Sequence, residues 1–211
     1  NEQELTRSYK AIVSEIYSPP RVTAAAEILK ELNIDHGLAL DLTTCNDNGE
    51  PWGFDKERMR VKAKRLVEEQ KPALLIGSPM CTMHSAWQRI NKWRGLKAYK
   101  AKLKAARRHL EFVCELYELQ RAGGRLFLHE HPDQASSWNE ACIMKILARD
   151  DVKTMKMDQC QFGQQSAEGE PIKKPTRWMS NSEAILKRLD RQCTGSSGLC
   201  SDGRAHRTCS G

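Results

Sequence analysis

Short apolar runs alternate with longer amphipathic segments along this chain, and the alternation predicts its fold. Runs 37–42, 73–77 and 125–129 are apolar without alternating polar positions, and Gly or Pro bounds them. Such runs are typical of strands that are covered on both faces. Segments 152–157 and 176–180 are further expected strands.

Segments with apolar residues three and four positions apart separate these runs and predict helices. The clearest spans 96–117 and ends before Gly123 and Gly124, which suit a helix C-terminus. Ser18, followed by two prolines, predicts the N-cap of an earlier helix. The expected helices cover 23–32, 56–69, 139–148 and 182–189 in addition.

Helices that alternate with strands indicate crossover connections and a mainly parallel sheet. We therefore expect an α/β domain over residues 1–190, a three-layer Rossmann-like fold with helices on both faces of the sheet. Residues 191–211 differ, because they are rich in Cys, Gly and Ser and poor in apolar side chains. They form either a zinc-binding appendage or a flexible tail.

The composition fits one domain. The chain has 211 residues, of which 39% are hydrophobic and 29% charged. No apolar run approaches the about 20 residues that cross a bilayer, and no signal peptide is visible. We expect an intracellular protein with no membrane partner, whose eight cysteines are reduced. The absence of an initiator Met suggests a piece of a longer polyprotein.

Positive charge is concentrated in one segment. The net charge is +7, and residues 70–110 contain no Asp or Glu. A block of one sign suits a polyanion such as nucleic acid, although a solvated helix face has the same composition. The ten basic residues of the block are Lys71, Arg89, Lys92, Arg94, Lys97, Lys100, Lys102, Lys104, Arg107 and Arg108.

Polar motifs follow three of the expected strands, at 41–44, 78–85 and 129–132. Ligands of parallel sheets bind beyond the carboxyl ends of the strands, so these motifs predict the site. Helix amides and basic neighbours should lower the pKa of Cys81 and favour a nucleophilic thiolate, unless Cys81 is a buried structural cysteine. Glu130 should be desolvated, with a raised pKa, unless it pairs with Arg125 or another base.

Two groups of side chains could ligate a metal. Cys193, Cys200, His206 and Cys209 could hold a tetrahedral zinc ion in the tail. His129 and His131, which share one face of an extended strand, are the second and weaker pair of candidates.

The strand-end motifs resemble those of C5-cytosine DNA methyltransferases. Gly77-Ser-Pro-Met-Cys-Thr-Met-His-Ser85 is similar to the catalytic loop Gly-x-Pro-Pro-Cys-x-x-Phe-Ser, and His129-Glu-His-Pro132 is similar in place to Glu-Asn-Val. Leu40-Asp-Leu-Thr-Thr44 resembles the first-strand motif Asp-Leu-Phe-x-Gly. Segments 158–163 and 174–177 faintly resemble the later motifs, and Tyr17-Ser-Pro-Pro20 resembles an element of amino-methyltransferases. The whole pattern also resembles methyltransferase-like segments of retroelement or viral polyproteins.

The resemblance implies a reaction and a set of residues. Cys81 would attack C6 of a cytosine that has left the duplex, Glu130 would bond N3, and S-adenosylmethionine would supply the methyl group to C5. Nucleic acid, DNA rather than RNA, would be the partner. The implied residues are Ser78, Pro79, Cys81 and Glu130 for catalysis, Tyr17, Pro19, Asp41, Thr43, Thr44, Asp55 and Ser78 for the cofactor, and Arg89, Lys92, Arg94, Lys97, Lys100 and Arg177 for nucleic acid.

Departures from the family pattern keep two alternatives open. Met80 replaces a proline, and no glycine follows Asp41 before Gly49. The segment from Asp41 to Cys81 is also too short for the usual strands, which leaves Asp55 as the expected ribose ligand. The domain could therefore be a non-catalytic nucleic-acid-binding module on a degenerate methyltransferase scaffold. It could also be a hydrolase that pairs Cys81 with a histidine.

Overall fold

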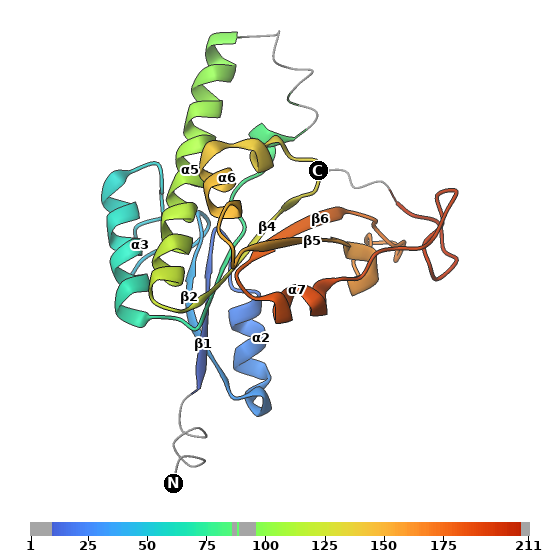
Figure 1. Cartoon of the computed structure of the whole chain (residues 1–211), viewed down its shortest axis with the longest axis horizontal. Helices are drawn as coiled ribbons and strands as arrows, with labels where there is room; N and C mark the ends of the chain where they lie inside the picture. The colour runs from blue at the N-terminus through green and yellow to red at the C-terminus, as the bar shows by residue number, and fades with distance from the viewer. Residues whose placement is uncertain (1–9, 86–87, 89–95, 208–211) are drawn as a thin grey trace.

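The computed structural model describes residues 10–85, 88 and 96–207, and Figure 1 shows a central sheet between two layers of helices. The six strands are β1 (Ala11–Ile16), β2 (Ile34–Leu40), β3 (Leu74–Gly77), β4 (Leu126–Pro132), β5 (Lys153–Asp158) and β6 (Pro175–Ser180). Their order in the sheet is β2-β1-β3-β4-β6-β5. The first four are parallel, and β6 runs antiparallel to both β4 and β5. The mainly parallel α/β fold expected from the sequence is thus confirmed.

Helices cover both faces of the sheet, as predicted. The helices are α2 (Val22–Ile28), α3 (Glu57–Gln70), α5 (Leu96–Ala122), α6 (Ala141–Leu147) and α7 (Glu183–Leu189), and the 3₁₀ turns are η1 (Lys30–Leu32), η2 (Thr82–His84), η4 (Ser136–Asn139) and η5 (Gln159–Phe162). In Figure 1, α3, α5 and α6 lie on one side of the sheet, with α2 and α7 on the other. The larger core lies under α3, α5 and α6 and includes Phe54, Leu75 and Tyr117, whereas a smaller one joins Val13 and Ile76 to Leu186 of α7.

Strand β1 was not predicted, and it changes how the motifs map onto the sheet. Ser14 and Glu15 interrupt its apolar pattern, yet both are buried because the fold supplies hydrogen bonds for them. β1 lies between β2 and β3, so β2 is an edge strand. Asp41 therefore follows the edge strand, whereas Tyr17-Ser-Pro-Pro20 follows the inner strand β1.

The prediction that Ser18 caps the first helix is wrong, because Glu15 of β1 bonds to the amides at the start of this helix instead. α2 begins at Val22, and its first amides bond to the carboxylate of Glu15, with Oε2 accepting from the nitrogens of Arg21 (3.0 Å) and Thr23 (2.8 Å). Ser18 Oγ also donates to this carboxylate, at 2.9 Å. Burial raises the pKa of Glu15, but the hydrogen bonds outweigh it and the pKa is lowered. The helix N-terminus is already occupied by a carboxylate from the chain itself.

In the part of the chain that the structure describes, no helix combines the length and the apolar character needed to cross a bilayer.

Candidate functional site

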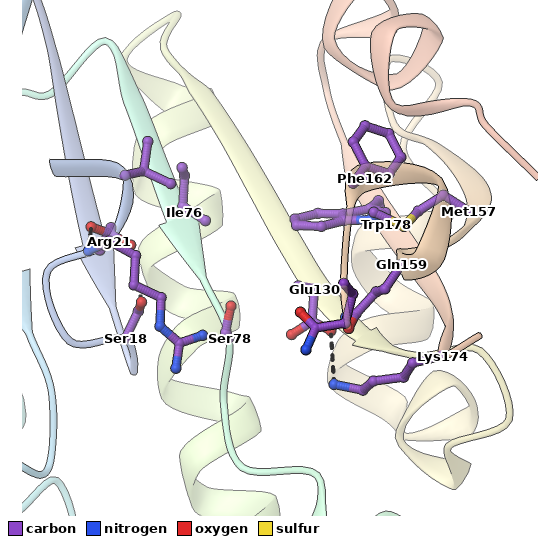
Figure 2. A pocket seen from close by; sticks show the side chains of 13 residues that line it. Ser18, Arg21, Ile76, Ser78, Glu130, Met157, Gln159, Phe162, Lys174 and Trp178 are labelled. Atoms are coloured by element: carbon purple, nitrogen blue, oxygen red, sulfur yellow. Dashed lines mark hydrogen bonds and ion pairs between the residues drawn. The ribbon is translucent and has the colours of Figure 1, made fainter. Parts of the chain in front are cut away.

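A cavity of about 440 Å³ opens at the carboxyl ends of the inner strands. As Figure 2 shows, Ser18, Arg21 and Ser78 line one side, and Lys174, Trp178 and Phe162 lie across from them. Glu130 lies within β4, near its C-terminal end, on the same side as Lys174 and Trp178. The cavity therefore lies where parallel sheets bind their ligands, and it contains two of the predicted catalytic residues, Ser78 and Glu130.

Glu130 carries a buried carboxyl group with an unused oxygen. Its side chain is 19% exposed, and among the described residues Oε1 has no hydrogen-bond partner; Lys174 Nζ lies 4.0 Å away. Burial raises the pKa of Glu130, while Lys174, Arg21 and Ser78 lower it less. The expected raised pKa is confirmed. A carboxyl group in this state can donate its proton to a bound acceptor.

Cys81 differs from the expectation. It lies at the start of η2, and burial raises the pKa of its thiol; Lys174 lowers this pKa and Glu130 raises it further. The predicted lowering is wrong because η2 is a single 3₁₀ turn, too short for a strong helix dipole, and because burial dominates. Glu130 and Lys174 nevertheless act on both thiol and cavity, so the loop and the strand end belong to one electrostatic site.

Two buried histidines of β4, His129 and His131, support the loop that carries Cys81, and His131 contacts this loop directly. His131 lies between the Pro79 carbonyl oxygen, 2.7 Å from Nε2, and Ser137 Oγ, 2.6 Å from Nδ1. His129 stacks on it with ring centroids 5.1 Å apart and pairs with Tyr117 through Nδ1, at 2.9 Å. Burial lowers the pKa of both rings. Burial therefore favours the neutral form of both rings, and with both ring nitrogens of His131 engaged it offers little to a metal or a hydrolase.

The residues expected to hold S-adenosylmethionine do not surround one cavity. The Tyr17 hydroxyl is buried against His109 Nδ1 at 2.9 Å, and Asp55 meets the other nitrogen of that ring at 3.1 Å, beside a second cavity of about 350 Å³. Asp41 Oδ1 accepts from the nitrogen and the hydroxyl of Thr43, at 2.9 and 2.6 Å.

Of the implied set, Ser78 alone lines the Glu130 cavity; Pro19 and Thr44 do not. The turn from β1 to α2 contains no glycine, and the Glu15 carboxylate already accepts from the first amides of α2. The expected residues therefore do not fit the cofactor.

The predicted nucleic-acid ligands are also dispersed. Lys97 and Lys100 are exposed in the first turns of α5, away from the cavity lining. Arg177 is bound to Asp133, with nitrogen–oxygen distances of 2.8 and 2.7 Å, and covers the Trp138 ring. The others, Arg89, Lys92 and Arg94, lie outside the described residues.

Sequence reasoning missed Arg21, Lys174, Trp178 and Phe162 as cavity residues. These residues are far apart in the sequence: Arg21 precedes α2, Phe162 ends η5, Lys174 precedes β6, and Trp178 lies within β6. The only local signal for a cavity residue among these was the basic segment Lys174-Pro-Thr-Arg177. Lys174 lines the cavity, and Arg177 does not.

A second cluster of functional groups lies beside η5. Cys160, Cys193, Cys200 and His206 bring four ligand atoms within 4.8 Å of one another, an arrangement that could hold a metal ion. Burial raises the pKa of Cys193, but hydrogen bonds from Ser201 and the Gly195 amide outweigh it and lower the pKa to about 6. Three of these residues belong to the predicted tail set; Cys160 was not predicted, and Cys209 lies outside the described residues.

The fold and these sites define an α/β domain with a polar cavity at the ends of its parallel strands and a separate cluster of thiol and imidazole ligands. No model of a known protein family and no curated protein matches the sequence.

Proposed function

We propose that this domain binds nucleic acid and takes an unpaired cytosine into the Glu130 cavity, on a methyltransferase-like scaffold. The observation that carries the proposal is Glu130, whose carboxyl group has a raised pKa and whose buried Oε1 has no hydrogen-bond partner among the described residues. A buried polar group left unpaired destabilises a protein by about 1–3 kcal/mol, so such a group suits a ligand that completes its bonding. The Trp178 indole nitrogen, in the same cavity wall, is likewise buried with no hydrogen-bond partner in the described part of the chain.

The chemistry of the lining matches a nucleotide. A protonated Glu130 would donate a hydrogen bond to N3 of cytosine, which is an acceptor on the Watson–Crick edge. Trp178 and Phe162 offer aromatic surface for the base, and stacking of this kind contributes about 1–3 kcal/mol per base. Arg21 and Lys174 would meet the phosphates. The volume of about 440 Å³ lies within the usual range of small-ligand pockets.

Fluorescence anisotropy with labelled single-stranded oligonucleotides tests this function. We expect tighter binding to oligo-dC than to oligo-dT, because N3 of thymine carries a proton and would face the Glu130 proton. Trp178→Ala should weaken oligo-dC binding by about 5- to 150-fold. The control is Trp52→Phe, a ring in the core away from the cavity. Equal affinity for the two oligonucleotides, or no effect of Trp178→Ala, would contradict the proposal.

A catalytic role of Cys81 is the second candidate, because its thiol lies near enough to Glu130 and Lys174 for both to act on its pKa; burial and Glu130 raise that pKa, Lys174 lowers it, and Cys81 lies outside the cavity lining. The thiolate would add to C6, and the electron pair displaced from the C5–C6 bond would move toward N3, which takes the proton of Glu130. Because the cofactor residues do not fit S-adenosylmethionine, we propose no methyl-transfer step.

Two traps separate the candidates. An oligonucleotide with 2-pyrimidinone in place of cytosine would form a Cys81 adduct by addition alone, whereas a stable adduct with 5-fluorocytosine also requires S-adenosylmethionine. Mass spectrometry of the wild type and of Cys81→Ser would detect the covalent adduct in both experiments. No adduct in either experiment, with intact binding of oligo-dC, would leave a non-catalytic binding module.

For the cluster beside η5 we propose zinc, with no part in base recognition. Thiolate and imidazole ligands suit zinc, and a tetrahedral ion with Zn–S bonds of about 2.3 Å and Zn–N bonds of about 2.0–2.1 Å separates its ligand atoms by about 3.5–3.8 Å. The sulfurs of Cys193 and Cys200 lie 3.8 Å apart, and Cys193 Sγ lies 3.6 Å from His206 Nε2.

A further inference from the structure

We infer that the metal bound by Cys160, Cys193, Cys200 and His206 fastens the C-terminal segment to η5 and thereby holds one wall of the Glu130 cavity in place. Cys160 lies within η5, and its neighbours Gln159 and Phe162 line that cavity. The other three ligands belong to the segment 191–207. The inference rests on the zinc proposed for the cluster, and it does not depend on which ligand enters the cavity.

The cavity wall has few other supports. η5 is a 3₁₀ turn of four residues, none of which is buried. Its connections to the sheet are short polar contacts: the Gln159 nitrogen donates to Lys174 O at 3.2 Å, and Gln159 Nε2 donates to Thr176 Oγ1 at 3.1 Å. A turn with so little buried apolar surface opens easily unless a cross-link holds it.

The C-terminal segment, like η5, has little buried apolar surface of its own to hold it in place. In the described structure, 191–207 contains no helix and no strand, and its best buried side chains are the two ligands Cys193 and Cys200. It meets the β5–η5 junction directly, where the Cys193 nitrogen donates to Asp158 Oδ2 at 2.8 Å and Arg191 covers the Phe162 ring at 5.2 Å. Segments too small to bury a core are commonly ordered by a metal, whose binding energy is folding energy.

Groups around the four ligands are arranged as an outer shell. Gln161 Nε2 reaches the sulfurs of Cys160 and Cys200, at 3.5 and 3.7 Å, and Ser201 Oγ reaches Cys193 Sγ at 3.4 Å. Hydrogen bonds of this kind orient metal ligands. Gly195 lets the chain fold tightly here, because a Cβ at this position would lie 2.1 Å from Leu199 O. The alternative is a Cys193–Cys200 disulfide, which would need the sulfurs to approach from 3.8 Å to about 2.05 Å and would leave Cys160 and His206 unused.

Metal content of the full chain gives the first test. We expect about one zinc per chain, by inductively coupled plasma mass spectrometry, in the wild type and in Cys45→Ser, whose exposed thiol lies outside the cluster. Cys193→Ser should lose most of the metal. His206→Cys keeps four soft ligands and should retain the metal. This variant shows that a substitution in the cluster does not by itself prevent folding, so the loss of zinc in Cys193→Ser can be assigned to the missing ligand.

Hydrogen exchange gives the second test. Chelation of the metal should speed exchange of the 159–164 amides by about tenfold or more, while the amides of α3 stay protected. A metal-free wild type, or a Cys193–Cys200 disulfide in non-reducing peptide mass spectrometry, would overturn the metal site. Bound zinc whose removal leaves 159–164 unchanged would overturn its role in the cavity wall. Neither readout uses nucleic acid, so failure of cytosine recognition is distinguishable from failure of this inference.

Discussion

Replacement of Glu130 by methionine should stabilise the free protein while it abolishes ligand binding. Glu130 Oε1 is buried with no hydrogen-bond partner among residues 10–85, 88 and 96–207, which destabilises the fold by about 1–3 kcal/mol. Among the groups that favour the carboxylate, Lys174 acts more strongly than Arg21 or Ser78; it lies 4.0 Å away with a side chain that is 36% exposed, and such pairs contribute about 0–1 kcal/mol. Methionine has a similar length and no group to satisfy. We therefore expect the free energy of unfolding to rise by about 1–2 kcal/mol at pH 7, once the lost ion pair is subtracted.

Thermal and urea denaturation can measure this gain. For a chain of this size, 1–2 kcal/mol corresponds to an increase in Tm of about 2–8 °C. Glu115→Met, at an exposed position of α5, should change the free energy of unfolding by no more than about 0.5 kcal/mol. If Glu130→Met instead destabilised the protein by more than about 1 kcal/mol, the carboxylate would have a structural role, and the inference that it is kept for a ligand would fail.

Four further outcomes are expected. Affinity for oligo-dC should fall as the pH rises through the raised pKa of Glu130, because the donor proton is lost; Glu130→Gln, which keeps a donor, should give a flat profile. Lys174→Ala should reduce the slope of log affinity against log salt by about 1, and an unchanged slope would remove Lys174 from the phosphate contacts. Burial lowers the pKa of His131 to about 4, so the neutral ring contributes fully to the free energy of unfolding above the unfolded-state pKa of about 6.5. This contribution is lost as the pH falls toward 4. Urea titrations should show a decrease in the free energy of unfolding of up to about 3 kcal/mol from this residue, and the decrease should be absent in His131→Asn. Gly77→Ala should destabilise the fold by about 1–3 kcal/mol, since the new Cβ would lie 2.1 Å from the Tyr117 hydroxyl; partial recovery in the double variant with Tyr117→Phe would identify that clash as the cause.

The sequence predicted most of the elements because their periodicity is local. The amphipathic pattern of α5 and the apolar runs of β3 and β4 identify these elements without reference to the rest of the chain. β1 escaped prediction because Ser14 and Glu15 make it look polar. Their burial is tolerable only because partners distant in the sequence, such as Gln70, satisfy them.

Local pattern also predicted two residues of the candidate site, but only one of their two pKa shifts. Cys81 and Glu130 were recognisable as strand-end residues, and parallel strands bring such ends to one edge of a sheet. The direction of the Glu130 shift followed from its place at the end of an apolar strand. The Cys81 shift did not, because desolvation of the thiol depends on neighbours from several elements and here outweighs the basic segment.

The sequence by itself therefore determined the layered α/β architecture and the two strand ends at which chemistry is expected. The tertiary structure decided which side chains meet there. It placed Lys174 and Trp178 across from Arg21, bound Arg177 to Asp133, and brought Cys160 to the ligands of the C-terminal segment. Periodicity is fixed by neighbours a few residues apart, whereas a cavity and a ligand cluster are made by residues that only the packing of distant segments brings together.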